Sequence, residues 1–316
     1  MKKTIAIILS LAMIILSAVP AFAAEETYNI GICQLVEHVA LDAATQGFID
    51  AVEEALGDKV VIDKQIAAGD SNTCATIINQ FVSNDVDLIM ANATPALQAA
   101  AAGTFDIPIL GTSVTEYGVA LEIADFTGTV GYNISGTSDL APLDQQAEML
   151  IEIFPEAKNV GLLYCSAEAN SAYQVKVVTE ALTAKGITCT PYPFSDSNDL
   201  AAITTAACET SDVIYVPTDN TAASATGIID GICRPAGVPV IAGEEGICSG
   251  CGVATLSISY YDLGVATGKM AVKILAEGAD ISTMPIEYAP NFAKKYNAEI
   301  AAELGVTIPE GYEAIA

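Results

Sequence analysis

The sequence has few positively charged residues. Lysine and arginine together number 12, against 39 aspartate and glutamate residues, and the net charge is −27. Nucleic-acid binding needs a cationic face, so we expect no nucleic-acid partner. Arg234 is the only arginine, and a bidentate guanidinium clamp in a binding site would need that residue. A zwitterionic or neutral ligand is therefore more expected than a phosphorylated, sulfated or dicarboxylate one.

Residues that commonly carry catalysis are also scarce. His38 is the only histidine, so a Ser-His-Asp or Cys-His arrangement would have to use it. The sequence has no Gly-x-Ser-x-Gly nucleophile elbow, no Walker A loop and no Gly-x-Gly-x-x-Gly dinucleotide fingerprint. Glu244 and Glu245 are adjacent, so their side chains diverge and make a poor acid–base pair. We therefore expect no enzymatic activity, no cofactor and no bound metal.

The eight cysteines leave two interpretations open. Some fall inside apolar strand patterns and could be paired or simply be small buried hydrophobic residues, namely Cys33, Cys165 and Cys189. Cys248 and Cys251 have the spacing of a redox or metal-binding pair, but they lead into a strand rather than opening a helix. No second Cys/His pair accompanies them for zinc. We expect a disulfide between these two cysteines, or between one of them and Cys233.

The beginning of the sequence has the pattern of a signal peptide. Lys2 and Lys3 precede an apolar run at 5–15, and small residues at 21 and 23 form a cleavage site. We expect residues 1–23 to be removed after Ala23, with an uncleaved anchor as the alternative. This region has no cysteine for a lipid anchor, and no other apolar stretch could span a bilayer. The expected location is extracytoplasmic, in a periplasm or at the cell surface.

Three segments of the sequence occur twice, in the same order. The matching pairs are 29–32 and 159–162, 87–90 and 212–215, and 107–111 and 238–242. Their offsets are 130, 125 and 131 residues. This repeat predicts two similar lobes, and two lobes make a cleft in which the loops after matching strands face each other.

Strand-like and helix-like segments alternate in both halves, and the strands are near-continuous apolar runs. This pattern favours an α/β fold with parallel sheets covered by helices on both faces. Residues 113–138 are predicted to be a loop between the halves. The tail is predicted to contain a strand at 254–259, a helix at 260–276, a short strand at 286–288 and a terminal helix at 291–304. Because the tail belongs to neither repeat, it could cross back and tie the lobes together.

Ligands of open parallel sheets bind beyond the carboxyl ends of the strands. The repeat pairs six such loops: 34–38 with 166–171, 92–94 with 218–220, and 112–115 with 243–246. Hydroxyl groups and helix N-termini in the first half suit a carboxylate, and we expect Thr94, Ser113 and Thr115 to bind it. Asp219, with Asn170, is the expected acceptor for an ammonium group. Such a site fits an amino acid.

Other side chains complete the candidate site. We expect Gln34, Glu37 and His38 to line the end that holds the ligand side chain. The remaining candidates are Asn133, Glu168, Asn220 and Glu244. Ordinary roles compete with these assignments, because Thr, Ser, Asp and Asn before helices are common N-caps. His38 could likewise be a capping or surface residue, and Glu244 could lie in an exposed turn.

Several segments together resemble a known family. They are 31–38, 86–90 with 93–95, 111–115, 217–221, 243–246 and 260–264. They are similar to substrate-binding proteins of ABC transporters of the tryptophan/tyrosine type, over nearly the whole chain after residue 23. The resemblance implies a type I periplasmic-binding-protein fold, with two Rossmann-like lobes joined by a three-strand hinge. It places 28–113 and 258–280 in one lobe, 114–257 and 281–289 in the other, and 290–316 in a C-terminal helix and tail.

The resemblance also implies a role. The expected protein is the extracytoplasmic solute-binding component of an ABC importer, which binds a small zwitterion such as an aromatic amino acid and delivers it to the permease transmembrane subunits. One alternative is a sensor that presents its ligand to a receptor. Others are binding of a sugar or nucleoside-like ligand, and an exported enzyme that uses the glutamates or the cysteine pair.

Overall fold

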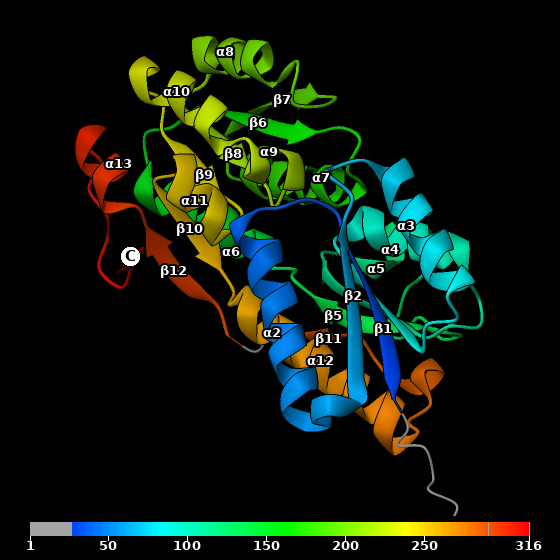
Figure 1. Ribbon diagram of the computed structural model, residues 1–316. Coiled ribbons are helices and arrows are strands. Elements are labelled where there is room, and N and C mark those ends of the chain that lie inside the picture. Colours follow the sequence, from blue (N-terminus) through cyan, green and yellow to red (C-terminus); the bar gives the residue numbers. More distant parts are fainter. Residues whose placement is uncertain (1–26, 290, 316) are drawn as a thin grey trace, which may run out of the picture.

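The chain forms two α/β lobes, which lie one above the other in Figure 1. The computed structural model describes residues 27–289 and 291–315, so the predicted signal peptide lies outside the described residues. Each lobe contains one largely parallel sheet. The lower lobe in Figure 1 (lobe 1) holds the first strands, and the upper lobe (lobe 2) holds the middle of the chain and its C-terminal helix.

Lobe 1 is built on a six-stranded sheet, sheet A, whose neighbouring strands are all parallel. The strand order is β11-β5-β4-β3-β1-β2. The strands are β1 (Tyr28–Gln34), β2 (Val60–Ile66), β3 (Leu88–Asn92), β4 (Ile109–Val114), β5 (Ile134–Ser138) and β11 (Glu287–Tyr288). The helices are α2 (Val39–Leu56), α3 (Ser71–Ser83), α4 (Thr94–Gly103), α5 (Tyr117–Ala120) and α12 (Tyr260–Glu277), with short 3₁₀ turns at Gly57–Lys59 and Ile281–Thr283.

Helices cover both faces of sheet A. Alternate residues of its central strands point to opposite faces and so pack against different helices. Ile89 of β3 belongs to the core cluster that includes residues of α3 and α4. Its neighbours Leu88 and Met90 belong to the cluster that includes residues of α2 and α12. Burial on both faces requires apolar residues at successive positions, which explains the continuous apolar runs in the sequence.

Lobe 2 is built on a seven-stranded sheet, sheet B, in the order β13-β12-β10-β9-β8-β6-β7. The strands are β6 (Asn159–Cys165), β7 (Thr188–Phe194), β8 (Val213–Val216), β9 (Val240–Ala242), β10 (Ala254–Ser257), β12 (Ala293–Tyr296) and β13 (Glu313–Ala314). The helices are α6 (Leu143–Ile153), α7 (Ala169–Ala184), α8 (Leu200–Thr210), α9 (Asn220–Ser224), α10 (Thr226–Ala236), α11 (Glu245–Cys251) and α13 (Ala298–Glu303). Among the described strands of sheet B, only the pairing of β10 with β12 is antiparallel.

The repeat found in the sequence corresponds to matching strands of the two sheets. The order β4-β3-β1-β2 in sheet A has the same topology as β9-β8-β6-β7 in sheet B. The repeated segments include β1 and β6, β3 and β8, and β4 and β9. The predicted duplication and the predicted α/β fold class are therefore confirmed.

The chain passes between the lobes three times, after β5, after β10 and after β11. The predicted division needs a correction at two places, because β5 and β11 pair with sheet A although 114–257 and 281–289 were assigned to lobe 2. The β5 segment (ISGTS) contains one large apolar residue, so its pattern predicts a loop rather than a buried strand. Pairing with β4 and burial against α12 make it a strand nevertheless.

The C-terminal segment also differs from the prediction. The predicted helix at 291–304 is a strand, β12, followed by the shorter helix α13. Asn297 separates them, because its side-chain oxygen accepts hydrogen bonds from the N–H groups of Glu299 and Ile300, both at 3.1 Å. This N-cap fixes the point where the helix begins.

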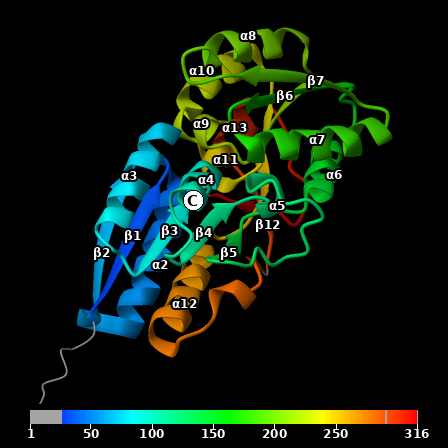
Figure 2. The same ribbon diagram turned by 90° about the vertical axis from the view of Figure 1, so that its right-hand side faces the viewer.

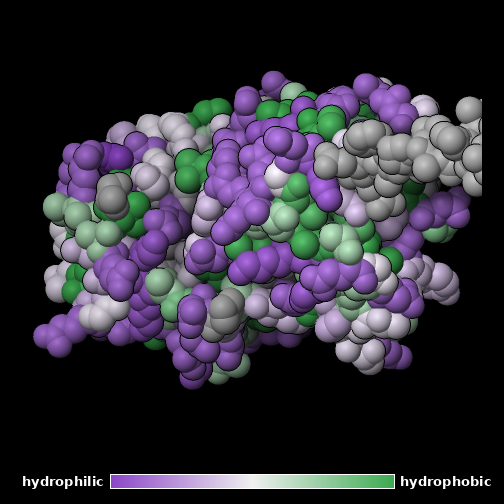
Figure 3. Space-filling view, turned by 60° about the horizontal axis from the view of Figure 1, so that its bottom comes forward, coloured by the Kyte–Doolittle hydropathy of each residue, from purple (hydrophilic) through white to green (hydrophobic). Residues whose placement is uncertain are grey.

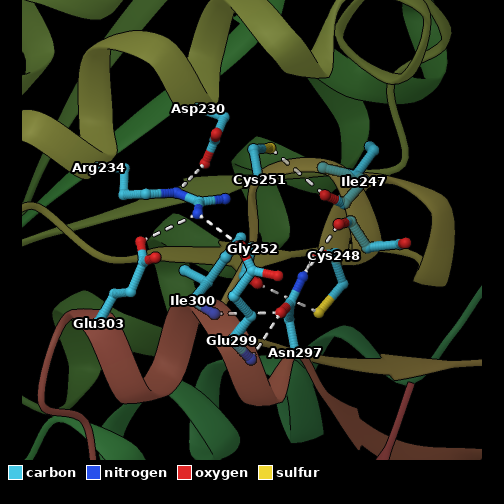
Figure 4. Close-up of polar contacts among 11 residues, drawn as sticks. Asp230, Arg234, Ile247, Cys248, Cys251, Gly252, Asn297, Glu299, Ile300 and Glu303 are labelled. Atoms are coloured by element: carbon cyan, nitrogen blue, oxygen red, sulfur yellow. Dashed lines mark hydrogen bonds and ion pairs between the residues drawn. The ribbon is translucent and has the colours of Figure 1, made fainter. Parts of the chain in front are cut away.

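Arg234 of α10 forms ion pairs that link α10 to α13, as Figure 4 shows. Its guanidinium pairs with Asp230 at 2.8 Å, Glu299 at 3.2 Å and Glu303 at 3.0 Å. Asn297 adds a hydrogen bond to the Ser249 carbonyl oxygen at 2.9 Å. The only guanidinium of the chain thus joins α10 to the C-terminal helix and does not lie among the strand-end loops.

All eight cysteines lie in the described part of the chain, and all are free. The expected disulfide that involves Cys248 or Cys251 is therefore wrong in this structure. Both cysteines lie in α11, where the Cys251 thiol contacts the Ile247 carbonyl oxygen at 3.3 Å and the Cys248 thiol contacts the Gly252 carbonyl oxygen at 3.7 Å. The helix directs the two thiols to different backbone groups.

Within residues 27–289 and 291–315, no helix is both long enough and apolar enough to cross a membrane. Figure 3 shows one face of the molecule, on which hydrophilic residues interrupt the hydrophobic ones.

Helices α2 and α12 lie side by side in both Figure 1 and Figure 2. They approach closely because glycines lie at the contact: a Cβ atom at Gly264 would clash with the Ala44 carbonyl oxygen, and one at Gly47 with the Tyr261 carbonyl oxygen. The contact holds α12, which follows the second crossing, against the first helix of lobe 1.

We expect Gly264→Ala to lower the melting temperature of the protein by several degrees, because overpacking costs about 1–3 kcal/mol. Gly231→Ala is the matched control. Gly231 also lies inside a helix, but a Cβ atom there would meet no neighbour. This control should be neutral or stabilising by up to about 1 kcal/mol. Circular dichroism during heating measures both, and an unchanged melting temperature for Gly264→Ala would contradict the packing argument.

Candidate ligand-binding site

The carboxyl ends of the two sheets face each other across a groove between the lobes. A pocket of about 430 Å³ is lined from lobe 1 by residues that include Leu35 and Pro95, and from lobe 2 by residues that include Glu168 and Asn220. The Nε2 atom of His38 lies 3.3 Å from the Asn220 side-chain oxygen and so connects the lobes directly. The predicted loops at 34–38 and 166–171 therefore meet, and Asn220 lies beside them.

Two strand ends of lobe 1 have strained backbone conformations. Ala93, between β3 and α4, has a φ of 94°, and Ser113, at a register shift in β4, has a φ of 53°. Buried non-glycine residues with positive φ are uncommon and concentrate at functional sites. Here they position the hydroxyl groups of Thr94 and Ser113, which are buried and have no hydrogen-bond partner among the described residues.

Helix α4 begins at the same place. Its N-cap is Ala93, which has no polar side chain, so within the described structure no side chain caps the first N–H groups of the helix. Free N–H groups at a helix N-terminus favour an anion. Together with the two hydroxyl groups, they give this edge of lobe 1 the donors that a carboxylate needs.

In lobe 2, by contrast, buried carboxylates satisfy the facing helix N-termini. Glu168 accepts hydrogen bonds from the Asn220 N–H at 3.0 Å, the Asn220 side-chain amide at 2.7 Å and the Thr221 N–H at 2.9 Å. Asp219 accepts from the Ala222 N–H at 2.8 Å through one oxygen and from the Cys165 N–H at 2.7 Å through the other. Asp219 therefore acts as the N-cap of α9 in this structure. This is the ordinary role that the sequence offered as the alternative to ligand binding.

Glu244 is also an N-cap and is not in an exposed turn. It is 2% exposed, and its carboxylate accepts hydrogen bonds from the N–H groups of Gly246, at 2.6 Å, and Ile247. Glu245 points elsewhere and pairs with Lys295 at 2.6 Å. The two adjacent glutamates thus have different surroundings.

Burial raises the pKa values of two carboxyl groups in this part of lobe 2, those of Asp219 and Glu244. Loss of water, together with the nearby Glu168 carboxylate, raises the pKa of Asp219 to about 8. Burial raises the pKa of Glu244 to about 7, although the hydrogen bonds from the Gly246 and Ile247 N–H groups lower it in part. A cationic group placed near these carboxyls would favour their charged forms.

His38 occupies the N-cap position of α2, but its side chain makes no capping hydrogen bond within the described structure. It reaches across the groove to Asn220 instead, and burial lowers its pKa. Its Nδ1 atom is buried without a partner among the described residues. His38 therefore faces lobe 2 across the groove, and its contact with a ligand stays a prediction.

Gln34 is fully occupied inside lobe 1. Its amide nitrogen donates to the Val36 carbonyl oxygen at 2.8 Å and to Asp42 at 2.7 Å, and its oxygen accepts from the Thr45 hydroxyl at 2.7 Å. These bonds hold the start of α2 against sheet A. Glu37 is exposed and lines a smaller pocket between the lobes.

The remaining predicted residues are divided between two places. Asn170 and Thr115 are buried at strand-end positions, and the Asn170 side-chain oxygen has no partner in the described ranges. Asn133 is the correction. It precedes β5, and its amide binds the carbonyl oxygens of Thr104 at 3.2 Å and Ile107 at 2.8 Å, at the amino end of sheet A. This edge is opposite the one where the ligand loops meet.

Sequence reasoning missed Asp139 and Tyr260. Asp139 follows β5 on the first crossing, and Tyr260 opens α12 after the second. The Tyr260 hydroxyl donates to Asp139 at 2.9 Å, and both residues are buried. An acidic residue directly after a strand is the signal that could have found Asp139, but the strand before it was predicted as a loop.

The chain matches the family model described as ABC transporter substrate binding protein over residues 29–316. A curated relative is a tyrosine-binding protein of Clostridioides difficile, which is 37% identical over 261 residues, or 82% of this chain and 75% of that protein.

Solved structures agree with this match. A substrate-binding domain from Streptococcus pneumoniae in complex with L-Trp has a TM-score of 0.87 and 33% identity, and the match covers 92% of this chain and all of that one. The ligand-free, open structure of a substrate-binding protein from Clostridium difficile has a TM-score of 0.69 and 37% identity, with 92% and 99% coverage. The chain therefore belongs to the family of ABC transporter substrate-binding proteins.

Proposed function

We propose that this protein is the extracytoplasmic, non-enzymatic binding component of an ABC importer. It binds an amino acid with an aromatic side chain between its lobes and delivers it to the permease. The ligand class rests on the relatives, one of which is named for tyrosine and another of which is in complex with L-Trp.

The conformation of the chain supports a ligand held between closed lobes. Its TM-score is higher with the L-Trp complex (0.87) than with the open, ligand-free structure (0.69), although the open protein has the higher sequence identity, 37% against 33%. Sequence distance therefore does not explain the difference. We attribute the difference to the arrangement of the lobes, and the His38–Asn220 contact across the groove supports a closed arrangement.

The observation that carries the proposal is a set of buried polar atoms without partners among the described residues. They include the hydroxyl oxygens of Thr94 and Ser113 and the side-chain oxygen of Asn170. Buried polar groups normally have hydrogen bonds, and leaving one without a partner costs about 1–3 kcal/mol. A bound amino acid would supply the partners. Its carboxylate accepts from Thr94, Ser113 and the first N–H groups of α4, and its ammonium group lies on the acidic side.

A thermal-shift screen of the common amino acids, sugars and nucleosides tests the ligand class. We expect tryptophan, tyrosine or phenylalanine to raise the melting temperature most, because a ligand that binds only the folded state stabilises it. A larger shift with a sugar or a nucleoside would overturn the proposal.

The carboxylate site is tested by Thr94→Val and Ser113→Ala. Each removes a hydroxyl donor, so we expect each to weaken amino-acid binding by about tenfold in calorimetry. Thr255→Val is the matched control, because Thr255 is also a buried threonine whose hydroxyl lacks a partner in the described structure, but it lies within β10. This variant should bind like the wild type, and equal losses in all three would contradict a carboxylate site at lobe 1.

A further inference from the structure

Asp139 has a distinctive position. It is the first residue after β5, where the chain leaves sheet A for lobe 2, and its N–H donates to the Val114 carbonyl oxygen at 3.2 Å. The preceding Ser138 hydroxyl donates to the Thr115 carbonyl oxygen at 2.8 Å. Asp139 is therefore fixed beside the 113–115 segment, which carries predicted carboxylate-binding hydroxyls.

The two oxygens of Asp139 differ. Oδ2 accepts a hydrogen bond from the Tyr260 hydroxyl at 2.9 Å, whereas Oδ1 is buried and accepts no hydrogen bond of normal geometry among residues 27–289 and 291–315. Burial raises the pKa of Asp139, and the nearby Tyr260 and Thr115 side chains lower it in part. The residue is 4% exposed. A buried carboxylate is costly unless it is paired, so an unoccupied oxygen in this place indicates a missing cationic or donor group.

The other buried carboxylates of the cleft do not have this property. Glu168, Asp219 and Glu244 each use both oxygens to accept backbone N–H groups in lobe 2. Their charges still contribute to a negative environment, and Glu244 is near enough to Asp139 for their charges to interact. Of these four carboxylates, Asp139 alone has an oxygen free for a new short contact within the described structure.

We propose that Asp139 is the residue that binds the ammonium group of the amino-acid ligand, through Oδ1. This assignment rests on the proposed function and replaces Asp219 as the expected ammonium partner. The ligand then lies with its carboxylate toward Thr94 and Ser113 and its ammonium group at the first crossing between the lobes. An ammonium group in this position would neutralise a carboxylate on the hinge itself.

Calorimetry with paired ligands tests the assignment. L-tryptophan is compared with indole-3-propionate, and L-tyrosine with 3-(4-hydroxyphenyl)propionate, because each second compound lacks only the amino group. In Asp139→Asn we expect the affinity for the amino acid to fall by at least about tenfold, while the affinity for the des-amino compound changes much less. Asp219→Asn, measured in parallel, removes a negative charge but no unpartnered oxygen, so we expect it to discriminate between the members of a pair less than Asp139→Asn does.

The outcomes separate the two proposals. If the wild type binds neither amino acid, the proposed function fails and the role of Asp139 fails with it. If the wild type binds but Asp139→Asn leaves binding unchanged, or weakens both members of a pair equally, only the Asp139 assignment is overturned. Should Asp139→Asn not fold, as judged by circular dichroism, Asp139→Ser is measured with the same ligand pairs and the same criteria.

A second inference comes from an independent observation in lobe 2. The thiol sulfurs of Cys208 in α8 and Cys233 in α10 lie 3.6 Å apart. Cys208 is partly exposed and Cys233 is buried. A disulfide requires an S–S distance near 2.05 Å, so a small side-chain movement separates this pair from a bond.

We infer that Cys208 and Cys233 form a disulfide when the protein meets a disulfide oxidant outside the cytoplasm. The accessible Cys208 thiolate attacks the oxidant and releases one thiol, and the Cys233 thiolate then displaces the second thiol from the mixed disulfide. Two protein thiols are oxidised, and one oxidant disulfide is reduced to two thiols. The bond would join two helices whose cysteines are 25 positions apart in sequence.

The test uses oxidised glutathione as the oxidant, followed by alkylation and peptide mass spectrometry without reduction. We expect one cross-linked peptide pair that contains Cys208 and Cys233, and a rise of several degrees in melting temperature. Cys208→Ser should abolish the cross-link, whereas Cys189→Ser, which removes another partly exposed cysteine, should not. Glutathione retained on Cys208, a cross-link between other cysteines, or no reaction would each overturn the inference.

Discussion

The structure depends on one constraint: the backbone N–H groups at the helix N-termini that follow parallel strands need hydrogen-bond acceptors. In each sheet these N-termini point to the carboxyl edge, and when the two edges close on each other their N–H groups are removed from water. Lobe 2 satisfies its own groups with Glu168, Asp219 and Glu244. In lobe 1, α4 begins after Ala93, which offers no side-chain acceptor. The first N–H groups of α4 therefore have no side-chain partner within the described structure, and an anion in the cleft would supply one.

On the proposed function, this asymmetry would let a duplicated fold recognise a ligand with two different ends. The strands of the two halves still match in order, but the residues after the third strand of each half have diverged, because Ala93 opens α4 without a side-chain acceptor and Asp219 caps α9. The acceptors in lobe 2 are mostly used internally, so their main effect on a ligand is electrostatic. The short contacts remain for Thr94, Ser113 and the crossing segment, where partners are missing among the described residues.

The sequence was sufficient for the repeat, for most strands and for the loops that meet. Apolar runs and their periodicity survive in the sequence because burial requires them. It was not sufficient for β5, because a strand with small polar residues is stabilised by pairing with its neighbour and not by its own pattern. As a result, the prediction included Asn133, which lies at the amino end of β5, and did not include Asp139 at its carboxyl end, which we propose as a ligand contact. Nor could the sequence distinguish a ligand-binding Asp219 from an N-cap, because both roles place the same residue before a helix.

The position of Asp139 connects recognition to motion. Asp139 lies on the first crossing between the lobes, where it is held between Tyr260 at the second crossing and the 113–115 segment of lobe 1. In the closed form without a ligand, its free oxygen is buried, which disfavours closure. An ammonium group reverses that penalty only where the lobes are closed around it. A ligand shifts a conformational equilibrium only if it binds one conformation more tightly than the other. A contact between Asp139 and the ammonium group that forms only in the closed conformation would therefore make closure depend on the bound amine.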